Sequence, residues 1–139
     1  MSLERLFVLD TNIIVSAVLI KESRARQALD KAQATGIVLI STPVLSELEE
    51  VLARPKFDKY VTVMERKLFL AGFVKTVKFV EVGEKIEACR DPKDDKYLEL
   101  AVSGNAICIV SGDADLLILN PFRDIPIMVV QEFLELELL

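Results

Sequence analysis

The chain has 139 residues, two cysteines, no histidine and a formal net charge of −5. This length suits one domain whose core needs no disulfides. Without histidine, a Ser-His-Asp triad, a histidine general base and the usual histidine-containing zinc sites are excluded, so catalysis would use carboxylates, Lys, Ser, Thr or a cofactor. No apolar run reaches the roughly 20 residues of a membrane span, and we expect a cytoplasmic protein without membrane association.

The first half of the chain alternates apolar runs with amphipathic segments. Buried strands are predicted at Leu6–Leu9 and Ile37–Ile40, because each is a short continuous apolar run. Ile13–Ile20 is predicted to be helical, and a second helix extends from the N-cap Ser23 to Gly36. Thr42-Pro43, an N-cap followed by proline at the first helical position, predicts a helix that runs to about Arg54.

The second half of the chain repeats this alternation. Helices are predicted at Lys56–Phe73 (with a break), from Asp91-Pro92 to about Ser103, at Asp115–Leu119 and at Gln131–Leu139; strands are predicted at Thr76–Val82, Ile107–Val110 and Ile127–Val130. Continuously apolar strands that alternate with helices indicate a parallel sheet covered on both faces. The predicted class is therefore α/β, with one domain over residues 1–139.

Two aspartates follow predicted strands. Asp10 comes directly after the first strand, and Asp113 follows the fourth after Ser111 and Gly112. Ligands of open α/β sheets bind beyond the carboxyl ends of the strands, so the two acids are expected at one edge of the sheet. The structural alternative, that each aspartate caps the helix after it, is about equally favoured for either residue alone.

The helix that begins at Thr42 carries further acids. On a helical wheel, Glu47 and Glu49 border the apolar arc on opposite sides, while Glu50 lies farther away. Periodicity therefore leaves Glu47 and Glu49 equally possible as site residues. A solvated position on the helix surface remains the simpler interpretation for either one alone.

The segment Asp91-Pro92-Lys93-Asp94-Asp95 is more informative. Asp91 is interpreted as a helix N-cap. A wheel drawn through the following helix places Asp94 within its buried arc and Asp95 at the far edge. An unpaired buried carboxylate is costly, so we expect a cation beside Asp94.

Acids from four separate places suit a hard divalent ion. Mg²⁺ and Mn²⁺ prefer oxygen ligands, and clustered carboxylates need a cation to offset their mutual repulsion. The predicted chemistry is polarisation of a phosphoryl oxygen and activation of water. The negative net charge is unusual for a nucleic-acid-binding protein, and the basic groups around Lys21, Arg54 and Lys93–Lys96 are most simply interpreted as solvated helix faces.

Four motifs together resemble the PIN domain family: VLDTN (8–12), STPVLSELEEVLARPKF (41–57), CRDPKDDKYLELA (89–101) and VSGDADLL (110–117). The resemblance extends from Phe7 to about Val130 and is greatest to the small single-domain toxins of toxin–antitoxin pairs. It implies a three-layer α/β/α sandwich with a central parallel sheet. It also implies a ribonuclease site that depends on Mg²⁺ or Mn²⁺.

The resemblance assigns residues as well. The core acids that it implies are Asp10, Glu47, Asp94 and Asp113, and this match selects Glu47 over Glu49. Asp115 follows in the same motif as a further metal ligand. Asn12 and Ser111 match the small polar residues beside the acids, where they could orient a carboxylate or a metal-bound water. Asp95 is a further supporting residue, at a position where the family tolerates other residues.

The same resemblance implies partners: an RNA substrate, an antitoxin that would cover the acidic cleft, and a second copy in a homodimer. The leucines of Glu132–Leu139 are a further hint of an interface. The main alternative is a non-catalytic PIN-like module that binds RNA or protein. An aspartate-phosphorylated signalling domain is disfavoured, because that class needs a lysine after a late strand and no lysine follows Lys96.

Overall fold

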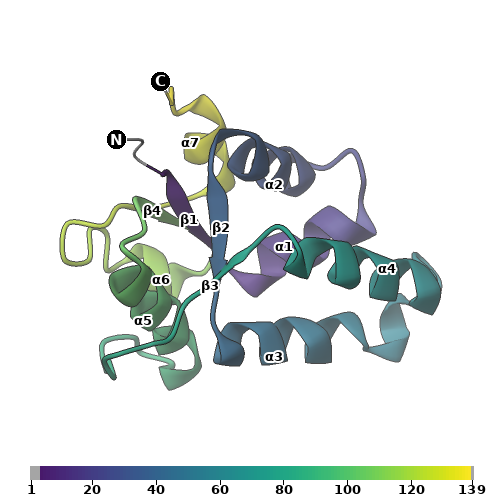
Figure 1. The fold of residues 1–139 in the computed structure, drawn as a ribbon, viewed down its shortest axis with the longest axis horizontal. Helices are drawn as coiled ribbons and strands as arrows, with labels where there is room; N and C mark the ends of the chain where they lie inside the picture. The colour runs from purple at the N-terminus through teal and green to yellow at the C-terminus, as the bar shows by residue number, and fades with distance from the viewer. Residues whose placement is uncertain (1–3, 139) are drawn as a thin grey trace.

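The computed structural model describes residues 4–138, which fold around a five-stranded sheet with the order β3-β2-β1-β4-β5 (Figure 1). All neighbouring strands are parallel. The strands are β1 (Leu6–Leu9), β2 (Ile37–Ile40), β3 (Lys78–Phe79), β4 (Cys108–Val110) and β5 (Ile127–Met128).

Helices cover both faces of the sheet, as Figure 1 shows. One layer holds α5 (Asp95–Gly104) and α6 (Ala114–Leu117), and the other holds α1 (Thr11–Leu19), α2 (Arg24–Thr35) and α7 (Val130–Glu135). Helix α3 (Thr42–Leu52) contacts both α1 and α5, and is followed by the 3₁₀ turn η1 (Pro55–Phe57) and α4 (Val63–Val74). A second 3₁₀ turn, η2 (Pro92–Asp94), precedes α5. The predicted α/β/α sandwich is confirmed.

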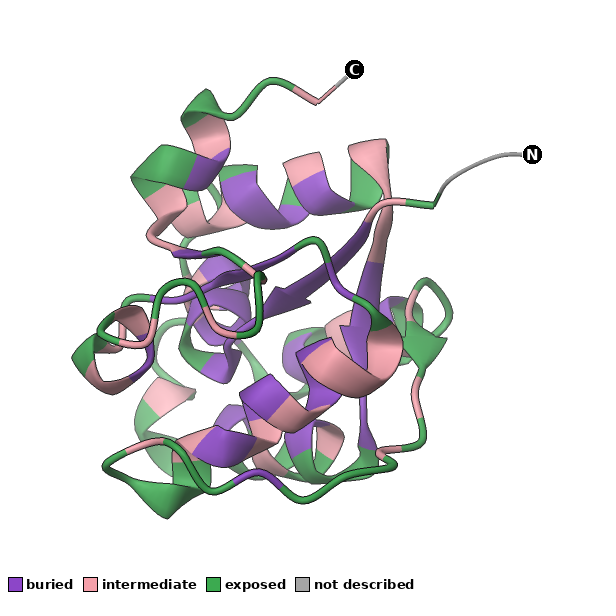
Figure 2. Cartoon of the chain, turned by 90° about the vertical axis from the view of Figure 1, so that its left-hand side faces the viewer, coloured by how far each residue is buried: buried purple, intermediate pink, exposed green. Residues whose placement is uncertain are grey.

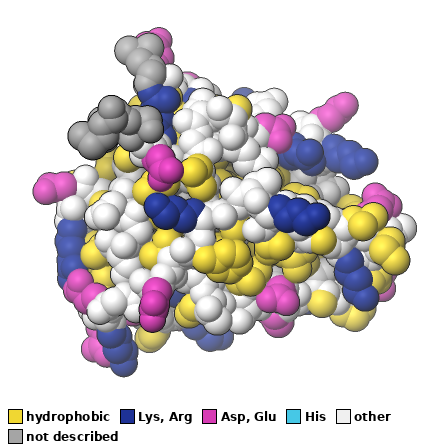
Figure 3. Space-filling view, in the orientation of Figure 1, with side chains coloured by type: hydrophobic (Ala, Val, Ile, Leu, Met, Phe, Trp, Pro, Cys, Tyr) yellow, Lys and Arg dark blue, Asp and Glu magenta, His cyan; other side chains and the backbone are white. Residues whose placement is uncertain are grey.

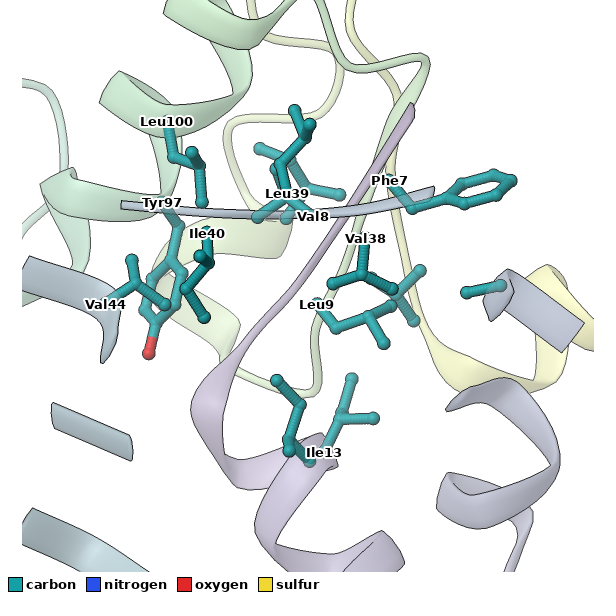
Figure 4. Close-up of a cluster of buried hydrophobic side chains, with 14 of the residues drawn as sticks. Phe7, Val8, Leu9, Ile13, Val38, Leu39, Ile40, Val44, Tyr97 and Leu100 are labelled. Carbon is teal, nitrogen blue, oxygen red and sulfur yellow. The ribbon is translucent and has the colours of Figure 1, made fainter. Parts of the chain in front are cut away.

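The core lies between these layers, and Figure 2 shows the buried strands at its centre. Strands β1 and β2 were predicted to the residue, because both faces of a central parallel strand are buried and every position is apolar. Side chains from β1, β2, α1, α3 and α5 interdigitate in the cluster drawn in Figure 4. Cys108 is buried in β4, as expected for a small core residue.

The strand order reverses at β1, which lies between β2 and β4. In open α/β sheets such a reversal leaves a crevice outside the carboxyl ends of the two strands. Here Leu9 pairs with Val110, and the backbone N–H of Asp10 donates to the carbonyl of Val110 at 3.0 Å. The residues that follow β1 and β4 are therefore held side by side.

Several predicted boundaries were wrong. The N-cap of α3 is Ser41 rather than Thr42, and α3 ends at Leu52. The predicted strand Thr76–Val82 shrinks to two residues, because β3 is an edge strand that pairs with β2 alone. The short helix predicted at Asp115–Leu119 is α6, which starts one residue earlier, after its N-cap Asp113.

The C-terminal segment also differs from its prediction as a helix to Leu139. Helix α7 ends at Glu135, and Leu139 lies outside the described residues. Leu134 and Leu138 pack partly against the core, so this segment offers fewer exposed leucines than its sequence indicated. No helix within residues 4–138 has the length and apolar character needed to cross a bilayer.

Candidate functional site

Asp10 lies at the carboxyl end of β1 and is 4% exposed. Its Oδ1 accepts the backbone N–H of Ile13 at 3.0 Å, and its Oδ2 accepts the hydroxyl of Ser111. The capping interpretation is therefore right for Asp10, which is the N-cap of α1. Burial raises the pKa of Asp10, although the hydrogen bonds from Ser111 and Ile13 act in the opposite direction. A cation near this carboxylate would relieve that cost.

Asp113 lies beyond the carboxyl end of β4 and caps α6, with its Oδ1 accepting the backbone N–H of Asp115 at 2.8 Å. The Ser111 hydroxyl accepts the backbone N–H of Asp113 at 3.0 Å and donates to Asp10. One hydroxyl thus connects the two strand-end acids. Capping does not exclude metal binding, because a carboxylate has two oxygens and several lone pairs.

Asp94, Asp113 and Asp115, hereafter the aspartate cluster, each offer an oxygen within 4.8 Å of the other two. The turn η2 delivers Asp94, and the start of α6 delivers the other two. Burial, together with the hydrogen bond and the charge of Asp113, raises the pKa of Asp94 to about 7. Within the described residues, the cation that contacts this cluster directly is Arg90, whose Nη2 lies 3.1 Å from Asp115 Oδ1 while its side chain is 87% exposed.

The helical wheel gave the wrong relative burial for Asp94 and Asp95. Asp94 is half-buried and ends the turn η2, whereas Asp95 is 7% exposed. The wheel failed because a 3₁₀ turn advances by about 120° per residue rather than 100°. Asp95 Oδ1 accepts the backbone N–H groups of Ala88 and Cys89 at 3.1 and 2.8 Å, so Asp95 anchors the preceding loop. Asp91 caps η2, as expected.

Glu47 contacts Thr11, the residue after Asp10, and the structure separates Glu47 from Glu49. Glu47 Oε2 accepts hydrogen bonds from Thr11 Oγ1 at 3.1 Å and from the Tyr97 hydroxyl, and lies 3.2 Å from Lys96 Nζ. Burial opposes ionisation of Glu47, but Tyr97 and Lys96 outweigh it and hold the pKa of Glu47 below its ordinary value. Glu49 is exposed beside a groove between α3 and α4. Glu47 is nevertheless not part of the aspartate cluster.

Sequence reasoning missed Thr11, Lys96 and Tyr97. Figure 4 shows the Tyr97 ring beside Ile40 and Val44, and its hydroxyl also accepts the backbone N–H of Thr11 at 3.1 Å. The interpretation of Lys96 as part of a solvated face was wrong, because its side chain is only 16% exposed. All three residues belong to the motifs VLDTN and DDKY, so their closeness in sequence to Asp10 and Asp94 could have indicated them.

Asn12 is exposed and lines an open cleft of about 370 Å³ together with Asp10, Ser16, Gly112 and Asp113. It makes no hydrogen bond through its side chain within residues 4–138. The cleft and the aspartate cluster share Asp113. Thr11, the residue after Asp10, donates to Glu47, and Ser111 links Asp10 to Asp113, so the predicted acids are connected in a row from Glu47 through Thr11, Asp10 and Ser111 to the cluster.

A family model described as "PIN domain" matches residues 6–115. The chain belongs to the PIN domain family. It is also 31% identical, over 115 residues, to an uncharacterized protein, MJ1680, of Methanocaldococcus jannaschii. That match covers 81% of this chain and 74% of the relative.

Solved structures show the same PIN-like fold. PAE2754 from Pyrobaculum aerophilum matches with a TM-score of 0.63 at 15% identity, over 94% of this chain and 88% of that one. VapBC2 from Rickettsia felis, bound to a DNA fragment from its promoter, matches with a TM-score of 0.56 at 18% identity, over 89% of this chain and 96% of that one. DNA-bound VapBC from Salmonella typhimurium gives 0.56 at 18% identity over 91% and 97%.

The donor set of this PIN domain fits a hard divalent cation. The cluster supplies carboxylate oxygens alone, which Mg²⁺ and Mn²⁺ prefer, and contains no sulfur or imidazole. Burial raises the pKa of Asp94, and the negative charges of Asp113 and Asp91 raise it further, so a cation here would relieve both effects. Asp94, Asp113 and Asp115 could hold an ion directly, with Asp10 linked to them through Ser111.

Proposed function

We propose that this PIN domain is a ribonuclease that depends on Mg²⁺ or Mn²⁺ and hydrolyses phosphodiester bonds in RNA. The observation that carries the proposal is the convergence of Asp94, Asp113 and Asp115, whose oxygens lie within 4.8 Å of one another beside the strand-order reversal. Three carboxylates held this close repel one another, and an ion would relieve that repulsion.

Each residue of the row has a proposed role. Asp94, Asp113 and Asp115 would hold the ion, and Asp10 and Glu47 would complete the acidic site. A bound Mg²⁺ or Mn²⁺ would stabilise charge on the phosphoryl group and lower the pKa of water. The Ser111 hydroxyl fixes the carboxylate of Asp10, and the N–H of Ile13 holds its second oxygen. These contacts orient the acid before substrate binds.

The proposed biological setting is a toxin–antitoxin pair in the cytoplasm, with a homodimeric toxin. The likeness to chains of two VapBC complexes supports an antitoxin partner. Exposed apolar side chains on α4 also support a protein partner, because Val63, Met64 and Leu68 are 50–64% exposed beside the groove between α3 and α4. Figure 3 shows hydrophobic side chains gathered over this region, as is common at protein interfaces.

RNA cleavage with Mn²⁺ and with EDTA tests the proposed reaction. We expect cleavage only with Mn²⁺, and a loss of roughly 100-fold or more in Asp10→Asn and Asp94→Asn, because even outer-shell changes at metal sites cost 10–100-fold. Asp30→Asn is the matched control, since Asp30 is an exposed acid on α2 that pairs with Arg26. Full activity in both site variants would overturn the residue assignment.

The alternative is a non-catalytic module that binds protein or RNA, which the exposed apolar face of α4 favours. Calorimetry with Mn²⁺ separates the two proposals, because a module of this kind does not need a metal ion. Size-exclusion chromatography with light scattering tests the homodimer, with a mass near 31 kDa expected for two chains of 15.6 kDa.

A further inference from the structure

Lys96 is a half-buried cation at the candidate site. Its side chain is 16% exposed, and its Nζ lies 3.2 Å from Glu47 Oε2. The same ammonium donates to the backbone carbonyl of Lys93 and lies 5.1 Å from the centre of the Tyr97 ring. Contacts from α3, η2 and α5 therefore fix its position, unlike that of an ordinary surface lysine.

The row of acids is unevenly compensated. At one end, the single carboxylate of Glu47 faces the ammonium of Lys96 and two hydroxyl donors, Thr11 and Tyr97. At the other end, the aspartate cluster brings three carboxylates together, and within residues 4–138 only the exposed guanidinium of Arg90 pairs with it. The Glu47 end is close to neutral, whereas the aspartate end has a deficit of positive charge.

A two-ion nuclease site requires two cations about 3.5–4 Å apart, each with its own carboxylates. A divalent ion at Glu47 would have to displace the ammonium of Lys96 or bind beside it against like-charge repulsion. At the aspartate cluster, the cation that forms an ion pair within residues 4–138 is Arg90, whose side chain is 87% exposed and can therefore be displaced into solvent by an ion. The aspartate cluster is therefore open to a divalent ion, whereas the position beside Glu47 is already occupied by the ammonium of Lys96.

We propose that Lys96 is a positioning residue whose ammonium replaces a second divalent ion beside Glu47, so that the site binds a single ion at the aspartate cluster. This inference rests on the proposed function. Lys96 acts through Glu47: it neutralises this carboxylate and holds it against Thr11 and Tyr97.

The test is the number of Mn²⁺ ions bound by the full chain, measured by calorimetry and by electron paramagnetic resonance. The wild type and Lys96→Arg are expected to bind one ion, because both carry a cation at this position. Lys96→Met is expected to bind two, since Glu47 loses its partner, and its spectrum should show the coupling of two nearby Mn²⁺ ions. Lys96→Gln is a second neutral variant in case Lys96→Met does not fold.

Lys93→Met is the matched control, because Lys93 is an exposed lysine three residues away in the same segment. It should bind one ion. Two ions in the wild type, or one ion in both neutral variants, would overturn the role of Lys96 while leaving the proposed nuclease intact. A wild type that binds no Mn²⁺ would overturn both this inference and the proposed function.

Discussion

The hydroxyl of Tyr97 joins three parts of the site, and its removal is a sharp test of the structure. It accepts the backbone N–H of Thr11 at 3.1 Å and donates to the carboxylate of Glu47, while the residue is only 3% exposed. Burial and the adjacent Glu47 raise the pKa of Tyr97, so the hydroxyl keeps its proton at all ordinary pH values. Tyr97→Phe removes both of these hydrogen bonds, and the contact of the hydroxyl with Thr11 Oγ1 at 2.8 Å, but keeps the ring in the core.

The expected loss of stability follows from the hydrogen bonds of the Tyr97 hydroxyl with Glu47 and with the backbone N–H of Thr11. A hydrogen bond to a charged group contributes about 1.5–3 kcal/mol, and a buried N–H without a partner costs about 1–3 kcal/mol. Because Thr11 and Lys96 still contact Glu47, we expect the free energy of unfolding of Tyr97→Phe to fall by roughly 2–4 kcal/mol. Urea unfolding at pH 7.5 in EDTA, followed by circular dichroism, measures this value.

The pH dependence has a definite sign. The folded-state pKa of Glu47 is lowered from its ordinary value of 4.5, so its stabilisation is present above that pH and is lost as the pH falls. The difference between wild type and Tyr97→Phe should therefore shrink below pH 4.5. Tyr60→Phe is the control, because Tyr60 is 65% exposed and its loss should change stability by less than about 0.5 kcal/mol. If Tyr97→Phe and Tyr60→Phe changed the free energy of unfolding equally, the buried hydrogen bonds of Tyr97 would not contribute to stability.

Three further substitutions test other parts of the structure. The pKa of Asp94 is raised from 3.8 to about 7, so its ionised form destabilises the folded protein at pH 7.5. After allowance for solvent screening, Asp94→Asn should stabilise the metal-free protein by roughly 1–2 kcal/mol at that pH. Urea unfolding should show no such gain near pH 4, where the folded protein already has a protonated Asp94. Gly36→Ala places its Cβ 2.1 Å from a backbone oxygen and should destabilise the fold by about 1–3 kcal/mol. Gly72→Ala, within α4 and free of contacts, should stabilise it by about 0.5–1 kcal/mol; a stabilising Gly36→Ala or a destabilising Gly72→Ala in thermal unfolding would contradict the packing. Arg66→Met removes buried hydrogen bonds to two carbonyls at the end of α3 and should cost roughly 2–3 kcal/mol, against less than about 0.5 kcal/mol for the exposed Arg54→Met.

Local sequence predicted the central part of the fold because there the local and the tertiary requirements coincide. Leu6–Leu9 and Ile37–Ile40 are fully apolar runs of four residues each. A short run of this kind is typical of a strand that helices cover on both faces. Ser23 was correctly predicted to cap α2, because its hydroxyl accepts the N–H of a residue three positions ahead. The strand predicted at Thr76–Val82 was too long, because the length of an edge strand depends on how far it pairs with its neighbour, here β2.

The candidate site was predictable to the same extent. Asp10 and Asp113 could be placed from strand ends alone, because parallel topology brings those ends together. The relative burial of Asp94 and Asp95 could not be predicted, because η2 interrupts the helical periodicity. The partners of Glu47 could not be predicted either, because Tyr97 is 50 residues away and meets Glu47 only through the packing of α3 against α5.

The apolar groove between α3 and α4 bears on how the proposed protein partner would bind. It has a volume of about 260 Å³ and is lined by Leu52, Val63 and Leu70, with Glu49 and Lys67 at its margin. A partner that binds there need not block the aspartate cluster, whereas one that covers the acidic cleft would. Competition between an antitoxin and Mn²⁺ would distinguish these two modes of binding.

Anomalous diffraction from crystals grown with Mn²⁺ would show whether the aspartate cluster binds a divalent ion, because it reports the position of the ion independently of activity. We expect one strong peak within ligand distance, about 2.0–2.3 Å, of oxygens from Asp94, Asp113 and Asp115. At saturating Mn²⁺, a map without a peak at this cluster, or with peaks only at other acids of the surface, would contradict the account.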